Sequence, residues 1–432
     1  MFRFRSVSVA FSIGLLVLCL GCSSPASAPQ PAAAPPPQPA PWPLTFQPAT
    51  LAIAPNSAEP QLMSHAGGAL VSWLEQSARG ATLKFAERTT AGTWSAVGTV
   101  ASGKDWFVSW ADVPSVTRLP GGTLVAQWLK NVDPAIEAYD LMLTSSHDNG
   151  RTWSTPFSPH HDRTRTQHGF ASLFPWADPG GQAGFGVVWL DGRDQELNTK
   201  DPEGGSMALY FARFDRAGKQ VAEAAVNERV CECCSTSVAV TSDGPIAAFR
   251  DRSDKEVRDI HVSRFDKGAW TAPVVVHADN WTIDSCPVNG PSITAAGMTV
   301  AVAWFAIKGE QGHAYTAFSR DGGRTFGAPV QLDDGTSLGH VGVEMLDDGS
   351  AAAAWVEFAD QRSHLRVRRV EASGQRSAPV EVAGSGAGHV SGHPRITRVG
   401  SDLLLAWTES KGEGDEGEGQ QVRVATAAIP PR

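Results

Sequence analysis

The chain has 432 residues, 42% of them hydrophobic, and carries a formal net charge of −9 at pH 7 with a pI near 5.7. This negative balance, without a cluster of Lys and Arg, argues against nucleic acid as a partner. The length suits either several ordinary domains or one closed repeat fold, so internal repeats must decide the number of domains.

The chain begins with a secretory leader. Residues 1–5 carry two arginines and no acid, and residues 7–18 form an apolar run too short to span a bilayer comfortably, so we interpret residues 1–21 as a signal peptide. The string Leu18-Cys19-Leu20-Gly21-Cys22 resembles the lipobox of bacterial lipoproteins, which implies lipidation of Cys22. Cleavage and ordinary secretion is the alternative, because Cys19 stands where that motif usually has leucine.

Residues 22–45 are predicted to form a tether between the lipidated cysteine and the folded domain. They are dominated by Pro, Ala, Ser and Gln, a composition that has little to bury and favours stiff, extended chain. Ser23 is not the aspartate that tends to retain lipoproteins at the inner membrane. The lipobox resemblance therefore implies an outer-membrane lipoprotein, periplasmic or surface-exposed, with the membrane as a partner through its lipid.

From residue 46 onward one strand pattern recurs, and each copy ends in an aromatic residue. The seven aromatic residues are Trp73, Trp128, Trp189, Phe249, Trp304, Trp355 and Trp407. A short strand precedes most copies and two weaker strands follow, which predicts a four-stranded meander per repeat. Such units bury their faces only against one another. We predict an all-β propeller over residues 46–432, with seven blades counted and the N-terminal strand at 49–54 completing the last blade.

Two turns share a pattern that carries a family signal: Ser146-His147-Asp148-Asn149-Gly150-Arg151-Thr152-Trp153 and Ser319-Arg320-Asp321-Gly322-Gly323-Arg324-Thr325-Phe326. Both resemble the Asp box, and the chain resembles the sialidase/BNR-repeat superfamily over residues 60–430. Sialidases of that superfamily are mostly six-bladed, so six blades is the alternative count. We expect each aspartate to bind amides of its own turn, which is a structural role.

Polar residues cluster at one phase of the repeat, two positions after each aromatic residue. Loops in this phase share one face of a propeller, so we expect a mixed-charge rim around the mouth of a central funnel. The expected ligand-binding residues are Arg193, Arg250, Arg252, Arg258, Glu357 and Arg395, and the candidate catalytic carboxylates are Asp191 and Asp251. Guanidinium groups bind carboxylates, and carboxylates serve as acid or base on sugars, which favours a carbohydrate or other anionic ligand. Solvated loops whose arginines and aspartates hold one another are the alternative.

A true sialidase mechanism is not expected. The superfamily's first arginine lies in a Phe/Tyr-Arg-Ile-Pro motif, and the nearest string here is His393-Pro394-Arg395-Ile396 at the wrong end of the chain. The three tyrosines, Tyr139, Tyr210 and Tyr315, fall in third strands, which predicts positions away from the mouth. Other hydrolytic or lyase chemistry stays open.

Four cysteines precede the first strands of two adjacent repeats: Cys231, Cys233, Cys234 and Cys286. We therefore expect them within bonding distance of one another at one rim. Disulfides are the ordinary outcome in an oxidising compartment, but adjacent cysteines pair only with strain. Thiolates together also suit Cu or Zn, or a redox-active disulfide. His160, His161, Asp162 and His168 form a second group, interpreted as a polar surface loop rather than a metal site.

Three functions remain after this reading: a glycan-directed enzyme with non-sialidase chemistry, a non-catalytic propeller that binds a ligand or protein, and an envelope metal or redox protein. A propeller fold hosts all three. We favour a monomeric sialidase-like propeller that binds or acts on carbohydrate at its central funnel.

Overall fold

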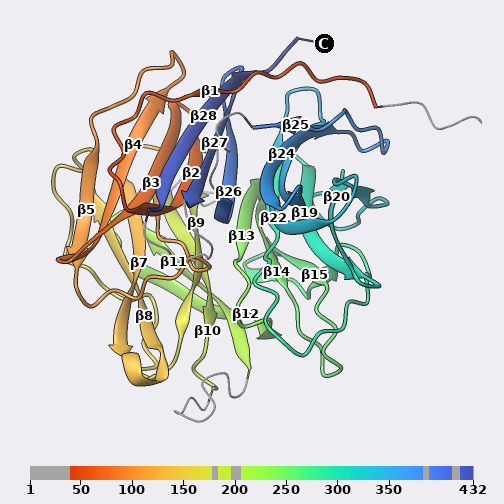
Figure 1. Ribbon diagram of the computed structural model, residues 1–432. Helices are drawn as coiled ribbons and strands as arrows, with labels where there is room; N and C mark the ends of the chain where they lie inside the picture. Colours follow the sequence, from red (N-terminus) through yellow and green to blue (C-terminus); the bar gives the residue numbers. More distant parts are fainter. Residues whose placement is uncertain (1–38, 178–182, 196–205, 383–388, 411–418, 432) are drawn as a thin grey trace, which may run out of the picture. The chain divides into compact units, whose positions relative to one another are not determined.

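Seven antiparallel β-sheets surround a common axis in the computed structural model (Figure 1). The structure describes residues 39–177, 183–195, 206–382, 389–410 and 419–431. Within this part of the chain the one helical element is the short 3₁₀ turn η1 (Pro134–Ile136). The predicted all-β propeller with seven blades is therefore confirmed, and the six-bladed alternative does not apply.

Each blade is a meander whose strands follow one another from the axis outward. Blade 1 contains β2 (Ser57–His65), β3 (Gly68–Ser77), β4 (Gly80–Thr89) and β5 (Gly98–Gly103), and blade 2 contains β6 (Ser115–Arg118), β7 (Leu124–Asp133) and β8 (Ala138–Ser146). Blade 3 contains β9 (His168–Ala177), β10 (Ala183–Asp191), β11 (Met207–Asp215) and β12 (Gln220–Val230). Blade 4 contains β13 (Ser237–Thr241), β14 (Gly244–Arg250), β15 (Ile260–Asp266), β16 (Ala269–Trp270) and β17 (Val274–Val275). In blade 2 the outer edge of β8 makes isolated bridges, between Leu143 and Phe157 and between Tyr139 and Gln167, in place of a fourth strand.

The remaining blades repeat the same order. Blade 5 contains β18 (Ser292–Ala296), β19 (Thr299–Lys308), β20 (Gln311–Ser319) and β21 (Val330–Gln331). Blade 6 contains β22 (Ser337–Met345), β23 (Ala351–Ala359), β24 (Arg362–Val370) and β25 (Val380–Glu381). Blade 7 contains β26 (His389–Val399), β27 (Asp402–Ser410), β28 (Gln421–Ala428) and β1 (Gln47–Pro48).

The N-terminal strand completes the last blade, as predicted. Gln47 and Pro48 of β1 pair with Thr426 and Ala425 of β28, and the Ala49 amide donates to the Val424 carbonyl at 2.8 Å. The paired residues lie just before the predicted stretch 49–54. Both ends of the chain therefore build one sheet, and this closes the ring.

The packed part of the chain includes residues that composition assigned to the tether. Trp42, Leu44 and Phe46 are at most 7% exposed and pack among side chains of blades 6 and 7. The predicted signal peptide, Cys22 and most of the predicted tether lie outside the described residues. No helix in the described ranges is long and apolar enough to cross a membrane.

The recurring aromatic residues of the second strands form the core between blades. Trp73, Trp189, Trp304, Trp355 and Trp407 are each at most 1% exposed. Because both faces of a second strand are covered by neighbouring blades, these strands are apolar almost throughout. Replacing one such tryptophan by alanine would cost about 3–5 kcal/mol of stability.

Hydroxyl groups tie the inner strands of neighbouring blades together. Ser172 donates to the Thr236 carbonyl at 2.9 Å, Ser237 accepts from the Ile293 amide at 3.2 Å, and Ser292 accepts from the Val343 amide at 3.1 Å. These serines serve backbone groups that the short inner strands leave without a partner in their own sheet. Hydroxyl groups therefore line part of the axis.

Each predicted Asp box has its aspartate at the centre of the turn. Asp148 accepts from the Thr152 amide at 2.9 Å and from the Thr152 hydroxyl at 2.7 Å, while Gly150 adopts φ 79°. The hydrogen bonds from Thr152 lower the pKa of Asp148 to about 2. Asp321 makes the same two contacts with Thr325 at 2.9 and 2.7 Å. The role of these aspartates is structural.

Candidate functional site

Three acids that follow a core tryptophan by two residues accept a hydrogen bond from its indole ring. Trp189 Nε1 donates to Asp191 Oδ2 at 2.7 Å, and Trp73 and Trp355 donate to Glu75 and Glu357 at 3.1 and 3.2 Å. In blade 5 this position is Ala306, and Asp279 takes its place, accepting from Trp304 Nε1 at 2.6 Å. The positions two residues after the aromatic residues, which were predicted to form a ligand-binding rim, therefore supply hydrogen-bond acceptors to the buried core.

Asp191 is enclosed by protein donors. It is 1% exposed, and besides the indole it accepts from the Arg193 amide at 2.9 Å and from Arg193 Nε and Nη2 at 2.8 Å each. Arg193 in turn contacts Glu223 at 3.0 Å and lies over the Tyr210 ring at 3.7 Å. The hydrogen bonds to Asp191 outweigh burial and raise the pKa of Arg193. Both carboxylate oxygens of Asp191 are thus occupied within the chain.

Asp251 lies on the neighbouring blade and accepts from Asn227 Nδ2 at 2.6 Å. Nothing in the described contacts brings it together with Asp191 at one reacting centre. A catalytic role for the two carboxylates therefore stays a prediction.

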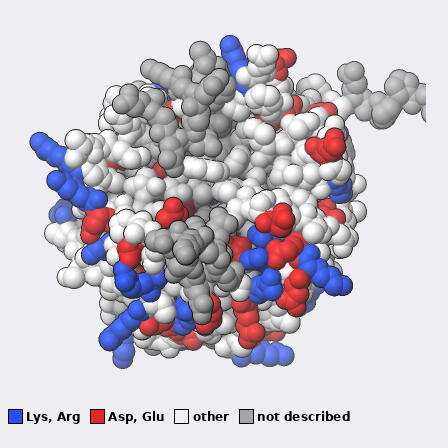
Figure 2. Space-filling model, turned by 60° about the horizontal axis from the view of Figure 1, so that its bottom comes forward, with Lys and Arg blue, Asp and Glu red and all other residues white. Residues whose placement is uncertain are grey.

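The arginines around Asp251 are bound within the chain. Arg250 is 2% exposed and donates to the carbonyls of Arg258, Asn289 and Phe305 at 2.6–3.1 Å, which joins blades 4 and 5. Arg252 and Arg258 pair with Glu232 and Glu256. Figure 2 shows acidic and basic side chains mixed over the face drawn, with no region of a single sign. These contacts agree with the alternative that the arginines and acids hold one another.

Arg395 differs from the other arginines that the sequence indicated. It lies on β26 in the wall of the central channel, and its guanidinium has no hydrogen-bond or acidic partner among the described residues. Burial alone lowers its pKa to about 10. A cation held this way, half-buried and unpaired, is open to an anionic group of a ligand.

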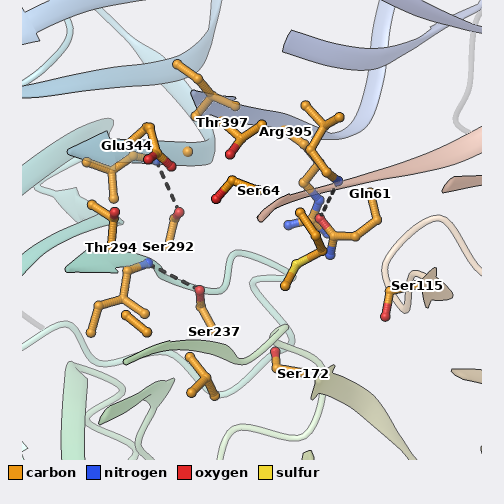
Figure 3. Close-up of a pocket in the computed structure, with 18 of the residues that line it drawn as sticks. Gln61, Ser64, Ser115, Ser172, Ser237, Ser292, Thr294, Glu344, Arg395 and Thr397 are labelled. Atoms are coloured by element: carbon orange, nitrogen blue, oxygen red, sulfur yellow. Dashed lines mark hydrogen bonds between the residues drawn. The ribbon is translucent and has the colours of Figure 1, made fainter. Parts of the chain in front are cut away.

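The channel has a volume of about 270 Å³ and is lined by the inner strands of all seven blades. Hydroxyl groups of Ser64, Ser115, Ser172, Ser237, Ser292, Thr294 and Thr397 surround it (Figure 3). In the same view Arg395 and Glu344 point into the channel from different strands, with Ser64 drawn between them. Burial raises the pKa of Glu344 to about 8, so this acid holds a proton at neutral pH.

Residues of four blades meet around Arg395 where the inner strands begin. The ring of Trp110 lies 5.8 Å from that of His393 and 5.9 Å from that of His340, and the two histidine Nδ1 atoms are 3.3 Å apart. Asn289 accepts from the His340 amide at 2.8 Å. We call Trp110, Asn289, His340, His393 and Arg395 the mouth cluster.

A positive φ and shifts of the strand register set the orientation of the two histidine side chains. His340 has φ 50°, and the strand register shifts in β22 near His340 and in β26 between Ser391 and Arg395. Such bulges turn side chains out of the regular alternation of a strand. Burial lowers the pKa of His340 to about 4 and that of His393 well below its ordinary value, so both imidazoles are neutral at pH 7.

Trp110 and Asp112, in the segment before the first strand of blade 2, were not predicted from the sequence. Asp112 Oδ2 accepts from the Phe170 amide at 2.6 Å, Oδ1 has no partner, and burial raises the pKa of Asp112 to about 7. Tyr139 was expected away from the mouth, but its buried ring lies against Gly169, at the entry of the next inner strand. The phase of the repeat would have indicated Trp110 if apolar residues before the first strands had been considered.

The four cysteines gather at one rim, as predicted. Sγ of Cys231 lies 3.9 Å from that of Cys233 and 3.4 Å from that of Cys234, and Cys286 forms a hydrogen bond with Cys233. No disulfide joins these four cysteines in the described chain, so the predicted disulfide is not seen. Arg258 Nη1 donates to Cys231 Sγ at 3.3 Å.

In the histidine group on the rim of blades 2 and 3, His160 and His168 are buried, whereas His161 is exposed as a surface loop would be. The His160 and His168 rings stack at 3.7 Å with 4° between their planes, and Asp162 contacts both, at 2.9 and 3.2 Å. Asp140 lies beyond the second nitrogens at 3.5 and 3.8 Å. Because the rings are parallel, an ion shared by those nitrogens would lie far outside both ring planes. The group suits a hydrogen-bond network better than a metal.

Comparison with known proteins shows the fold. No family model and no curated protein matches the chain. The polysaccharide lyase Uly1 overlaps with a TM-score of 0.51 at 11% identity, covering 88% of this chain and 91% of that one. The chain shares a β-propeller fold with it. A protein of unknown function from Dyadobacter fermentans (TM-score 0.48, 12% identity, 89% and 98% covered) and the NanB sialidase from Streptococcus pneumoniae (0.44, 10%, 87% and 94%) are also similar.

Proposed function

We propose that this propeller binds a carbohydrate-type ligand that carries an acidic group, and that the mouth cluster is the binding site. The observation that carries the proposal is Arg395, the one arginine among those indicated by the sequence whose guanidinium has no partner in the described chain. Uly1, which has a similar fold, is named a polysaccharide lyase, and this is in line with such a ligand.

Each member of the mouth cluster has a task that fits this ligand. The indole of Trp110, half-buried, offers an apolar face to the C–H groups of a sugar ring. Neutral His340 and His393 contact each other through Nδ1, which leaves Nε2 of one ring as an acceptor and Nε2 of the other as a donor for sugar hydroxyls. Arg395 pairs with a carboxylate or sulfate, and the hydroxyl-lined channel below admits polar groups.

Binding of acidic oligosaccharides to the purified protein, measured on a glycan array and by calorimetry, tests the proposal. Arg395→Gln should weaken binding at least about tenfold, since a charge-assisted hydrogen bond is worth about 1.5–3 kcal/mol. Trp110→Ala should weaken acidic and neutral sugars alike. Arg324→Gln, in an Asp-box turn where the arginine pairs with Asp243, is the matched control. Binding that survives both mouth variants, or the absence of any bound glycan, would overturn the proposal.

We also propose that Cys22 anchors the protein in the outer membrane, on the strength of the lipobox resemblance and the proline-rich tether. Cys22→Ser should move the protein from the membrane fraction to the soluble one and abolish lipid labelling. Retention in the membrane without a lipid label would refute the anchor.

A further inference from the structure

We infer that Cys231, Cys233 and Cys234 bind one thiophilic metal ion, Cu(I) or Zn(II), with Cys286 as the fourth ligand. The Sγ separations of 3.4 and 3.9 Å are far longer than a disulfide bond of about 2.05 Å. They bracket the separation of about 3.8 Å between ligands of a tetrahedral ion with metal–sulfur bonds of about 2.3 Å. The three sulfur atoms all lie within 4.8 Å of one another.

The fold delivers these ligands from two blades. Cys231 directly follows β12 and Cys234 comes three residues before β13, so the tight connection between blades 3 and 4 presents three sulfurs together. Cys286 comes from the segment that enters blade 5. Cys231 and Cys234 are 1% and 2% exposed, whereas Cys233 and Cys286 are half-buried. An ion would therefore enter from the side of Cys233 and Cys286.

Two buried arginines place positive charge beside the cysteines. Arg258 Nη1 donates to Cys231 Sγ at 3.3 Å and is itself held by Glu232 at 3.2 Å and Glu256 at 2.9 Å. Outer hydrogen bonds of this kind orient metal ligands and offset their charge. Arg250 adds a second buried positive charge close enough to act on Cys231 and Cys234. Soft thiolates select Cu(I) and Zn(II) over hard cations.

The inference is independent of carbohydrate binding, although the two sites are neighbours. Cys233 packs against the same apolar cluster as Trp110 of the mouth cluster. An ion at the cysteines would therefore hold the segment before β13 and the wall behind Trp110 in place. Failure of glycan binding would leave the metal site untouched, because its readouts are metal content and thiol reactivity.

Elemental analysis and native mass spectrometry of the full-length protein test the inference. We expect one Cu or Zn per chain, and thiols that react with a disulfide reagent only after a chelator is added. Competition with a Cu(I) chelator and substitution by Co(II), with its thiolate charge-transfer absorption, separate the two ions. A chain without metal whose thiols react directly, or whose mass is lower by two hydrogens per bond because disulfides have formed, would overturn the inference.

Single variants give the second measurement. Cys231→Ser and Cys234→Ser should lose stoichiometric metal while keeping the β-sheet circular dichroism of the parent. Asp254→Asn, at an exposed residue that pairs with Arg229 and contacts no cysteine, is the matched control and should keep one ion. Cys286→Ser should weaken binding at least tenfold, and unchanged affinity would remove Cys286 from the site.

Discussion

Asp112 should make this protein less stable as the pH rises through the acidic and neutral range. Its carboxyl group is 2% exposed, and burial raises its pKa from 3.8 to about 7. Between these two values the folded state holds a proton that the unfolded state has lost, so the free energy of unfolding falls with increasing pH. At 1.36 kcal/mol for each unit of pKa difference, the full loss is about 4 kcal/mol by pH 8.

The variant Asp112→Asn removes this titration and keeps the shape of the side chain. Its amide oxygen can accept from the Phe170 amide as Oδ2 does now, and its NH₂ group takes the place of the unpartnered Oδ1. Relative to the parent, the variant should therefore gain up to about 4 kcal/mol between pH 4 and pH 8.

Urea unfolding of both proteins at pH 4, 6 and 8 measures this difference. His340 and Glu344 also have shifted pKa values, but they are present in both proteins and cancel in the comparison. The reasoning is refuted if the stability difference between parent and variant stays constant with pH, or if the parent becomes the more stable protein as the pH rises.

Three further predictions concern the scaffold. Asp321→Ala removes the hydrogen bonds of its turn and should lower the melting temperature measured by calorimetry without changing metal content. Trp189→Phe leaves Asp191 Oδ2 without its indole donor and should cost about 1–3 kcal/mol in urea unfolding, whereas no loss would show that Arg193 alone satisfies the carboxylate. Gly169→Ala would place Cβ 2.0 Å from Asp112 Oδ2 and should cost about 1–3 kcal/mol, and an unchanged urea midpoint would contradict that packing.

The blade architecture could be predicted because each repeat carries its own signal. A second strand covered on both faces must be apolar and end in a large side chain, so Trp73 and its six counterparts mark the blades at a regular spacing. Closure of the ring was predicted from an unassigned strand at the start of the chain and a last repeat with only three strands. The length of the tether could not be predicted, because Trp42 and Leu44 stand isolated among prolines and alanines, and only the groove between blades 6 and 7 explains their burial.

The sequence predicted where the residues of the rim lie, but not all of the contacts that they make. The cysteines were found because their phase alone brings them together. Some partners of the arginines could not be predicted because they are distant in sequence: Arg250 binds the carbonyls of Asn289 and Phe305, which no local pattern reveals. Trp110 could not be predicted from the pattern of charged and titratable residues, and the bulge at His340 leaves no simple trace in the sequence.

The pairing of β1 with β28 constrains how the protein reaches its native state. Gln47 meets Thr426 across nearly the whole chain, so blade 7 cannot finish until the last residues have been synthesised and, if the chain is exported, have left the export channel. Until then the first six blades form an open arc whose two end faces are exposed apolar sheet. A chain shortened at either end would remain an open arc. Its exposed end faces would make it prone to associate with another copy.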